Sequence, residues 1–461
     1  MTERGALDAV SPLDGRYARY TEPLVPYASE RALMCARVQV EVEYLIALAD
    51  LDATPLAIDA DQREHLRGLY ESFDTDDASV VKQLETEGYG EYTATNHDVK
   101  AVEYFVRLNL PEDLDAGNWI HFGLTSEDVN NLAHRLLVEP AVEDVLVPEL
   151  RDVRDALAEM ARQYRDVPML ARTHGQPATP TTFGKEMAVY ASRLGRALAR
   201  IERAAGELSG KLAGASGTYA AHHAAYPDVD WPAFSREFVE DLGLNHEPLT
   251  TQVNPCDDLA ALFDALRGAN NVLLDLDLDV WLYVSDRYLG QETVEGETGS
   301  STMPHKVNPI DFENSEGNLS KANSDLTFLG DYVTKSRLQR DLSDSTVKRN
   351  IGAAFSHCLI GYQKCQNGLA KVVPNEQVMA DDLESTPEII GEAVQTVLRR
   401  EGHEDAYEQV KKATRGQHVT MEDFTAMIDD LDVSEDVREE LHALTPAGYT
   451  GIADEMVDGL E

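Results

Sequence analysis

The segment from residue 257 to residue 289, DDLAALFDALRGANNVLLDLDLDVWLYVSDRYL, is rich in leucine and contains no proline. In a second segment, residues 181 to 208, apolar side chains recur at spacings of three and four, as one buried helical stripe requires. The stripe consists of Met187, Tyr190, Leu194, Leu198 and Ile201. At about 1.5 Å per residue, helices of about 30 residues extend about 45 Å, which is long for a globular domain. Helices of this length usually belong to a bundle or to a subunit interface.

The segment from Asp311 to about Arg340 is expected to form a third long helix. Strand signals are few, so the sequence predicts an all-α fold. Three such helices carry more apolar surface than one chain readily covers, and we therefore expect a bundle completed by other copies of the chain. The predicted domains are an N-terminal helical domain (1–112), a central long-helix bundle (113–364) and a C-terminal helical domain (365–461).

The chain is strongly acidic, with a formal net charge of −43 and a pI near 4.5. Such a charge repels nucleic acid and anionic lipid, so neither is expected as a partner. It also opposes compaction at low ionic strength, whereas at about 1 M salt the Debye length falls to about 3 Å and the repulsion is screened. We therefore hypothesise a halophilic protein of a salt-rich cytosol, with Asp and Glu as a solvated surface layer.

The sequence contains no apolar run of about 18 residues, and MTERGALDAV at the N-terminus does not resemble a secretory signal. A cytoplasmic protein without membrane contact is therefore expected. Cys35, Cys256, Cys358 and Cys365 lack C-x-x-C spacing and are interpreted as buried thiols. The last two lie two helical turns apart, which is consistent with one face of a core helix.

Motifs that bind cofactors are missing from the sequence. Neither GxGxxG nor GxxxxGK[ST] occurs, and no G-x-S-x-G elbow supports a serine hydrolase. His222 and His223 are adjacent, point in different directions on a regular element and lack carboxylates at metal spacing. A dinucleotide-binding or P-loop site is therefore not indicated, and a metal site at His222 and His223 is rejected.

The stretch THGQ, residues 173 to 176, lies between prolines ahead of the second long helix. Pro177 and Pro180 should hold His174 in a constrained loop. A single histidine is more often structural than catalytic, but the ordinary imidazole pKa of about 6.5 suits proton transfer near neutral pH.

In HFGLTSEDVNN, residues 121 to 131, Thr125 and Asp128 have the spacing of a capping box. An ordinary N-cap explains this pattern. A helix start also presents free N–H groups, so Thr125 and Ser126 could hold a carboxylate as well.

The stretch NHDVKAVEYF, residues 96 to 105, brings His97 and Lys100 together at the start of another expected helix. The same two interpretations, a helix cap and a binding site, apply here.

Residues 335 to 349, KSRLQRDLSDSTVKR, are basic although Lys and Arg make up only 40 of the 461 residues. The five basic residues are Lys335, Arg337, Arg340, Lys348 and Arg349, and the hydroxyl donors are Ser343, Ser345 and Thr346. Such enrichment in an acidic chain predicts an anion site. The alternative is a surface patch paired with nearby aspartates.

The stretch GSSTMPHKVNP, residues 299 to 309, begins with small, mobile residues and ends between two prolines. Together with THGQPATP, HFGLTSEDVNN and TPAGYTG, it resembles the fumarase/aspartase superfamily. SPLDGRY, TNHDVKAVEYF, the His in MPHK, IDFENSEGNL and QRDLSDSTVKRN are similar to the adenylosuccinate lyase family, and the resemblance runs nearly end to end.

This resemblance implies a homotetramer with a central helical bundle and four active sites, each built by three subunits. The implied reaction is β-elimination of fumarate from adenylosuccinate and from the succinyl-carboxamide ribotide of purine biosynthesis, without metal or organic cofactor. Such chemistry needs a base, cations around a dianionic intermediate and an acid for the leaving nitrogen.

The resemblance also implies roles for residues of this chain. Ser300 would be the base, although only the family match chooses it over Ser301, and His174 would be the acid. The implied substrate-binding residues are Arg16, Tyr17, Asn96, His97, Asp98, Thr125, Ser126, Gln252, Ser301, Lys306, Asn308, Asn314, Arg340, Ser345, Thr346 and Arg349. Arg16, Tyr17, Arg340, Ser345 and Arg349 would bind the phosphate, and Lys306 and Asn308 the succinyl carboxylate. His121 is a less certain neighbour.

Other functions fit parts of the sequence. A sister lyase could release fumarate from another amine or from malate, and a helical scaffold could keep the fold without catalysis. An acidic module that mimics nucleic acid fits the charge but not the clustered cations.

Overall fold

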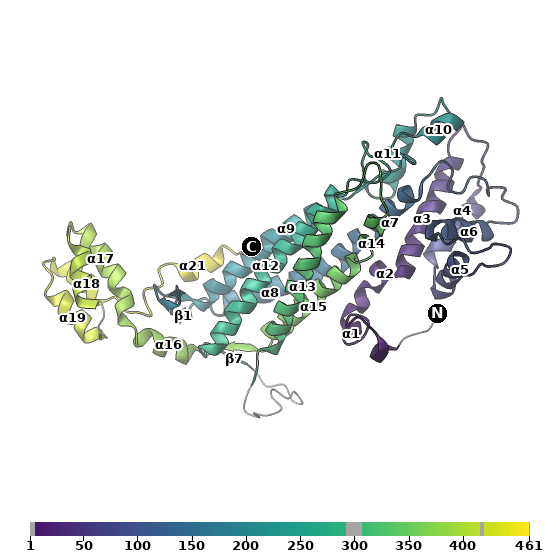
Figure 1. Ribbon diagram of the computed structural model, residues 1–461. Helices are drawn as coiled ribbons and strands as arrows, with labels where there is room; N and C mark the ends of the chain where they lie inside the picture. Colours follow the sequence, from purple (N-terminus) through teal and green to yellow (C-terminus); the bar gives the residue numbers. More distant parts are fainter. Residues whose placement is uncertain (1–4, 292–306, 415–418, 461) are drawn as a thin grey trace. The chain divides into compact units, whose positions relative to one another are not determined.

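The computed structural model describes residues 5–291, 307–414 and 419–460 (Figure 1). Helices dominate, and the strands have only two or three residues, which confirms the predicted all-α fold. Contacts divide the chain into two compact units. The first comprises residues 1–150, 197–271 and 317–361, and the second comprises residues 151–196, 272–316 and 362–461. The predicted domain boundaries at residues 112 and 364 stay a prediction.

The first unit contains most of the N-terminal helices, in which α3 packs against α4, α6 and α7. Its N-terminal elements are η1 (Ala6–Asp8), α1 (Ala18–Thr21), η2 (Glu22–Leu24), α2 (Val25–Ala28), α3 (Glu30–Ala49), α4 (Ala60–Glu71), α5 (Thr75–Thr86), α6 (Asp98–Leu108), α7 (Ser126–Pro140) and η3 (Ala141–Leu146). Its later elements are β5 (Ser209–Gly210), α10 (Ala220–Ala225), α11 (Trp231–Asp241), β6 (Asn245–His246) and α14 (Ser343–Lys348). Strands β5 and β6 pair in parallel.

Five long helices contribute residues to both units. They are α8 (Val147–Gln163), α9 (Phe183–Gly206), α12 (Asp257–Ser285), α13 (Ile310–Val333) and α15 (Ile351–Leu369). The predicted stripe of α9 is buried at all five positions, and Cys358 and Cys365 are buried on α15. Cys256 is buried as expected, whereas Cys35 is partly exposed.

Helix α13 ends at Val333, so the prediction of a helix to about Arg340 was wrong at its C-terminal end. Side chains there bond to the backbone in place of a helical ladder. Asp341 Oδ2 accepts from the Arg337 N–H at 3.0 Å, and Ser336 Oγ accepts from the Asp341 N–H at 3.2 Å. Such local hydrogen bonds compete with helix formation.

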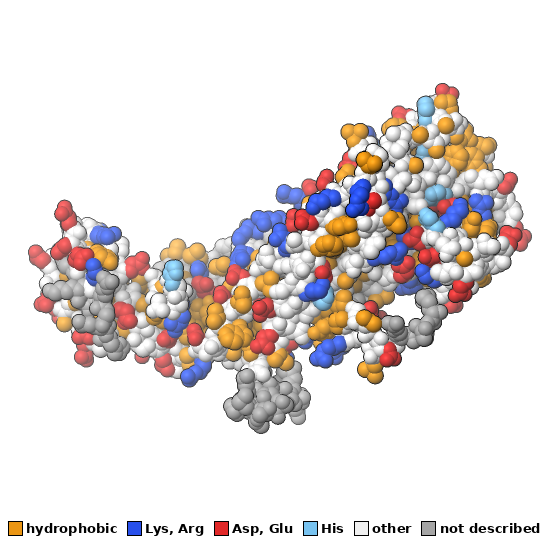
Figure 2. Space-filling model, viewed as in Figure 1, with side chains coloured by type: hydrophobic (Ala, Val, Ile, Leu, Met, Phe, Trp, Pro, Cys, Tyr) orange, Lys and Arg blue, Asp and Glu red, His pale blue; other side chains and the backbone are white. Residues whose placement is uncertain are grey.

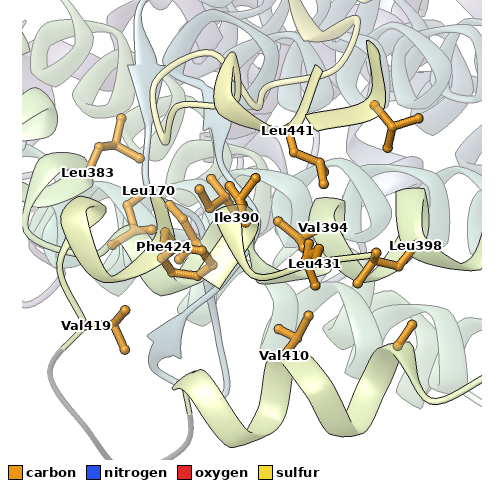
Figure 3. Packing of buried hydrophobic residues seen from close by; sticks show 14 residues of the cluster. Leu170, Leu383, Ile390, Val394, Leu398, Val410, Val419, Phe424, Leu431 and Leu441 are labelled. Carbon is orange, nitrogen blue, oxygen red and sulfur yellow. The ribbon is translucent and has the colours of Figure 1, made fainter. Parts of the chain in front are cut away.

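The second unit contains the antiparallel strand pairs and the C-terminal helices. Its strands are β1 (Pro168–Met169), β2 (Arg172–Thr173), β3 (Gln176–Pro177), β4 (Thr181–Thr182), β7 (Leu289–Gln291) and β8 (Val372–Pro374), paired as β1–β4, β2–β3 and β7–β8, all antiparallel. Its helices are α16 (Glu376–Glu384), η4 (Pro387–Ile390), α17 (Gly391–Arg400), α18 (Ala406–Thr414), α19 (Met421–Asp429), α20 (Glu435–His442) and α21 (Ala453–Asp458). Leu170, just after β1, packs with Ile390 and Phe424 in one apolar cluster (Figure 3).

A buried ion pair fixes the start of α7 in the first unit. Lys211 Nζ lies 2.7 Å from Asp128 Oδ1, and both side chains are inaccessible to solvent. Asp128 also accepts from the N–H groups of Ala213 at 2.9 Å and Thr125 at 2.8 Å. The carboxylate therefore joins the capping box of α7 to the chain after β5, and the predicted capping spacing of Thr125 and Asp128 is confirmed.

Charged side chains cover much of the surface. On the face drawn in Figure 2, Asp and Glu are spread over the surface with Lys and Arg among them. No helix that the structure describes combines the length and the hydropathy of a membrane span.

Replacing Lys211 with Met is expected to lower the free energy of unfolding by about 3–5 kcal/mol, because it leaves the Asp128 carboxylate buried without its cation. Chemical denaturation at a fixed protein concentration measures the change. Lys321→Met is the matched control, since Lys321 pairs with Asp325 on the exposed surface of α13. Exposed pairs contribute only about 0–1 kcal/mol, so equal losses in the two variants would contradict the role of the buried pair.

Candidate functional site

The first unit contains a cavity of about 340 Å³ that collects many of the predicted substrate-binding residues. Five parts of the chain line it: α3, the end of α5, the start of α6, the N-terminal part of α7 and the segment through α14. The predicted residues in its wall are Asn96, His97, Asp98, Ser126, Arg340, Ser345, Thr346 and Arg349. The structure thus brings together groups that lie up to 253 positions apart in the chain.

His97 serves both as a helix cap and as part of the cavity wall. Its Nδ1 accepts from the Lys100 backbone N–H at 3.2 Å, which caps α6. An accepting Nδ1 carries no proton, so a neutral imidazole holds its proton on Nε2. Nε2 lies 3.5 Å from Ser126 Oγ. His97 can therefore cap α6 and line a binding site at the same time.

Arg37 of α3 is a cavity residue that the sequence analysis missed. Its Nη2 lies 2.8 Å from Asp98 Oδ2, and its Nε donates to Asn130 Oδ1 at 2.8 Å. The side chain is only 3% exposed, and its buried Nη1 has no hydrogen-bond partner among the described residues. A buried guanidinium N–H without a partner is costly, so this donor suits an anionic ligand.

A second charged group lies around Glu127, at the start of α7. Its carboxylate, buried at 1% exposure, lies 3.2 Å from Lys348 Nζ and 3.4 Å from Arg340 Nη2. Lys348 also pairs with Asp344 at 2.9 Å. The Arg340 Nε is buried and has no hydrogen-bond partner among the described residues. Glu127 thus holds two cations at the cavity while one guanidinium N–H remains available.

Arg349 connects α14 to the same network. Its Nη2 lies 3.1 Å from Asp98 Oδ2, so Asp98 is shared between Arg37 and Arg349. These two guanidinium groups depress the pKa of the Asp98 carboxyl, although burial opposes them. Asp98 therefore stays ionised and organises the cations of the cavity.

Part of the basic segment 335–349 fits the predicted anion site, and part fits the alternative of a surface patch paired with aspartates. Arg340, Lys348 and Arg349 line the cavity, as an anion site requires. Lys335 and Arg337 instead line a separate surface groove with Asp331 and Asp341, and Arg337 pairs with Asp341 at 3.5 Å.

Several predicted residues lie elsewhere in the first unit. Gln252 Oε1 accepts from Arg340 Nη1 at 3.2 Å, just behind the cavity wall. Thr125 caps α7, and neither Arg16 nor Tyr17, which precede α1, is among the residues that line the cavity.

His121 lies in a carboxylate-rich environment with a left-handed backbone, φ 58°. Its Nδ1 lies 2.6 Å from Glu41 Oε1 and its Nε2 3.9 Å from Glu103 Oε1. Burial alone would lower the pKa of His121, but the two carboxylates outweigh it and raise the pKa. The imidazolium form is therefore favoured, although His121 does not line the cavity.

In the second unit, THGQ forms the tip of the β2–β3 hairpin. Thr173 pairs with Gln176, which leaves His174 and Gly175 as a two-residue turn with φ of 55° and 71°. Two consecutive positive φ angles are typical of a type I′ turn, in which the second position favours glycine. The backbone geometry presents the His174 side chain to solvent.

The remaining predictions fall on or near the stretch GSSTMPHKVNP. Ser300, Ser301 and Lys306 lie outside the described residues. Asn308 precedes α13 and Asn314 lies on it, both partly buried in the second unit.

Comparison with known sequences extends over the whole chain. A family model described as Lyase matches residues 15–323, and one described as Adenylosuccinate lyase C-terminal matches residues 336–450. Adenylosuccinate lyase of Escherichia coli strain K12 is 46% identical, with 100% of both chains covered. The enzymes of the same name from Haemophilus influenzae and Dictyostelium discoideum are each 44% identical. They cover 98% and 97% of this chain, and 99% and 97% of their own lengths.

Solved structures share the fold at lower identity. A fumarate lyase from Mesorhizobium sp. BNC1 superposes with a TM-score of 0.75 at 22% identity, covering 95% of this chain and 97% of its own. The 3-carboxy-cis,cis-muconate lactonizing enzyme from Pseudomonas putida has a TM-score of 0.72 at 21% identity, covering 96% and 97%.

Because four cationic side chains line the cavity, we expect inorganic phosphate to bind the folded protein and stabilise it. A ligand that binds only the folded state raises the melting temperature, by an amount that grows with its concentration over Kd. We expect Arg37→Gln to remove most of this shift, because the variant lacks the guanidinium, and Arg337→Gln to keep it. Thermal unfolding of each protein with and without phosphate provides the measurement, each variant being compared with its own phosphate-free sample. Equal shifts in both variants would contradict an anion site at Arg37.

Proposed function

The chain belongs to the adenylosuccinate lyase family, and we propose that it eliminates fumarate from adenylosuccinate to give AMP. It acts in the same way on succinylaminoimidazole carboxamide ribotide, giving aminoimidazole carboxamide ribotide in purine biosynthesis. The enzyme is a C–N lyase with a small-molecule purine nucleotide substrate. The observation that carries this proposal is the anion-receptive cavity of the first unit in a chain that is 46% identical to a named enzyme over its full length.

The cavity is proposed to bind the phosphate of the nucleotide. A phosphate dianion needs several charge-assisted donors, and guanidinium groups supply them in a planar arrangement. Arg37 Nη1 and Arg340 Nε are buried without hydrogen-bond partners in the described parts of the chain, and Arg349 also lines the cavity. Ser345 and Thr346 add hydroxyl donors from α14.

The reaction requires an acid and a base on opposite sides of the bond that breaks. The base removes a proton from the carbon next to a carboxylate, and the electron pair then forms the double bond of fumarate as the C–N bond breaks. The leaving nitrogen takes a proton from the acid. We assign the base to Ser300 and the acid to His174, by the family motifs that contain them. The exposed turn position of His174 suits a group that reaches out to a substrate.

Lys306 and Asn308 of the stretch GSSTMPHKVNP, residues 299–309, complete the proposed site. Lys306 and Asn308 would hold the succinyl carboxylate whose negative charge increases during proton removal, with Thr125, Ser126 and Gln252. Preorganised cations and N–H donors around such a dianion lower the barrier most when water is excluded.

A homotetramer is proposed from the family resemblance, and an exposed apolar stripe on the part of α12 in the second unit supports subunit contacts. Leu278, Trp281 and Leu282 lie on one face of α12, and 51%, 47% and 53% of their surfaces are exposed. Exposed apolar stripes on long helices usually mark subunit contacts. Other copies of the chain would then supply residues to each active site.

The proposed environment is a salt-rich cytoplasm, which the net charge of −43 supports. We expect the melting temperature, followed by circular dichroism, to be higher in about 1 M KCl than at low ionic strength, because salt screens the repulsion among carboxylates. A fold equally stable in both solutions would exclude halophilic adaptation.

The decisive test of function is turnover by the purified protein in molar KCl. We expect fumarate to form from adenylosuccinate, with little or no reaction from argininosuccinate or malate. Preferential release of fumarate from argininosuccinate, or addition of water to fumarate, would instead indicate a sister lyase.

In the same assay, Ser300→Ala and His174→Ala should each abolish turnover while leaving the oligomer intact by light scattering. His174→Asn serves as a matched variant, since asparagine tolerates the positive φ of the turn and removes only the imidazole. Near-wild-type rates in Ser300→Ala or His174→Asn would refute the assigned role.

A further inference from the structure

The hairpin that carries His174 is held from its base by Arg172. The Arg172 guanidinium lies between two carboxylates of the second unit. Its Nη2 donates to Asp382 Oδ2 at 2.7 Å, and its Nε lies 3.4 Å from Asp286 Oδ2. Asp382 is on α16, and Asp286 follows α12. Because Arg172 precedes the turn by only one residue, the position of its guanidinium limits where the turn can lie.

Asp382 is itself fixed by a buried tyrosine. The Tyr288 hydroxyl donates to Asp382 Oδ2, the same oxygen that Arg172 contacts. Tyr288 is 2% exposed, and burial together with the Asp382 carboxylate raises its pKa, so the hydroxyl stays protonated and donating. The backbone carbonyl of Tyr288 accepts from the Asn375 N–H at 2.8 Å, directly before α16. The Asp382 carboxylate is therefore held by the Tyr288 hydroxyl as well as by the Arg172 guanidinium.

Apolar packing attaches the stem of the hairpin to the same helix. Leu170 lies two residues before Arg172, and Leu383 follows Asp382; both belong to the apolar cluster drawn in Figure 3. Strand β1, just before Leu170, packs against α16. The stem thus has an apolar attachment, whereas the contact nearest the turn is the ionic one.

The contacts of Arg172 with Asp382 and Asp286, together called the clamp, also form part of a cavity wall. A cavity of about 540 Å³ in the second unit is lined by Arg172, Gly175, Asp286 and Tyr288, among others. Gly175 is the second residue of the turn, so the neighbour of His174 and the clamp face the same space. A shift of the Arg172 guanidinium would therefore change the cavity wall beside the turn.

We propose that Asp382 is a positioning residue for His174, acting through Arg172. The inference rests on the proposed function, in which His174 is the acid. The contact with Asp382 Oδ2 holds the Arg172 guanidinium toward α16. When Asp382 is neutralised, Asp286 becomes the stronger partner of the guanidinium and draws it the other way. A displacement of about 1 Å in a reacting group can cost about 100-fold in rate.

The test compares Asp382→Asn with wild-type enzyme on adenylosuccinate. We expect kcat to fall about 10- to 100-fold with KM within about twofold, because substrate binding does not use this group. Asp382→Glu, which keeps the carboxylate, should recover part of the loss. Asp381→Asn is the matched control. Asp381 is exposed on the same helix, accepts from Gln377 Nε2 at 2.7 Å, and should leave kcat unchanged on substitution.

The pH profile separates positioning from a loss of folded enzyme. Replacing Asp382 with Asn removes a negative charge from the ionic contacts at the base of the hairpin that carries the proposed acid, so the alkaline limb of kcat should move to lower pH. A smaller active fraction would lower kcat equally at every pH. If Asp382→Asn does not fold, Tyr288→Phe removes one anchor and keeps the aromatic ring, and the same two readouts apply.

Three outcomes overturn the proposal. One is a wild-type kcat in the substituted enzyme, and another is a lowered kcat with an unchanged pH profile. The third is a wild-type protein that does not cleave adenylosuccinate, which refutes the proposed function and this inference with it. If the wild-type enzyme cleaves adenylosuccinate and Asp382→Asn keeps the wild-type kcat, the positioning role of Asp382 is refuted and the proposed function is not.

Discussion

The buried carboxylate of Asp128 is the constraint on which the first unit depends. It satisfies the open end of α7 and the chain after β5, and the Lys211 ammonium compensates its charge without help from solvent. Because the start of α7 is fixed in this way, Ser126 and Glu127 enter the cavity wall in a defined position. Glu127 in turn holds Lys348 and Arg340. A series of buried charges thus connects Asp128 and Lys211 with the cations that line the cavity.

The cations of the proposed phosphate site are held in place although the chain as a whole is very acidic. These cations are not simply concentrated there, since each is paired with a buried or half-buried carboxylate, Asp98 for two arginines and Glu127 for two more cations. These pairs keep the cations in place against the field of the whole chain. Within residues 5–291, 307–414 and 419–460, two buried N–H groups of the cavity cations have no hydrogen-bond partner, Arg37 Nη1 and Arg340 Nε. Specificity then depends on direction as much as on charge, because a guanidinium donates along fixed lines.

Local patterns in the sequence predicted local structure well. The stripe of α9 and the capping box at Thr125 follow from spacing alone, and the basic segment pointed to the cavity. Arg37 could not be found in this way, because its partner Asp98 lies 61 positions away and nothing in α3 distinguishes a ligand from a core charge. The assignment of His174 as the acid comes from the family motifs rather than from periodicity, and it stays a proposal. The end of α13 was not predicted, because hydrogen bonds of the Ser336 and Asp341 side chains compete with the helix.

The left-handed turn at His174 has an evolutionary consequence. Single-base changes in a histidine codon lead to Asn, Asp, Gln, Tyr, Leu, Pro or Arg, and among these only Asn and Asp commonly occupy positive φ. For most neighbouring genotypes the positive φ therefore adds a conformational strain of about 1–2 kcal/mol at this position. The two replacements that the turn accepts, Asn and Asp, carry no imidazole, so conformation opposes one set of substitutions at this codon and side-chain chemistry opposes the other.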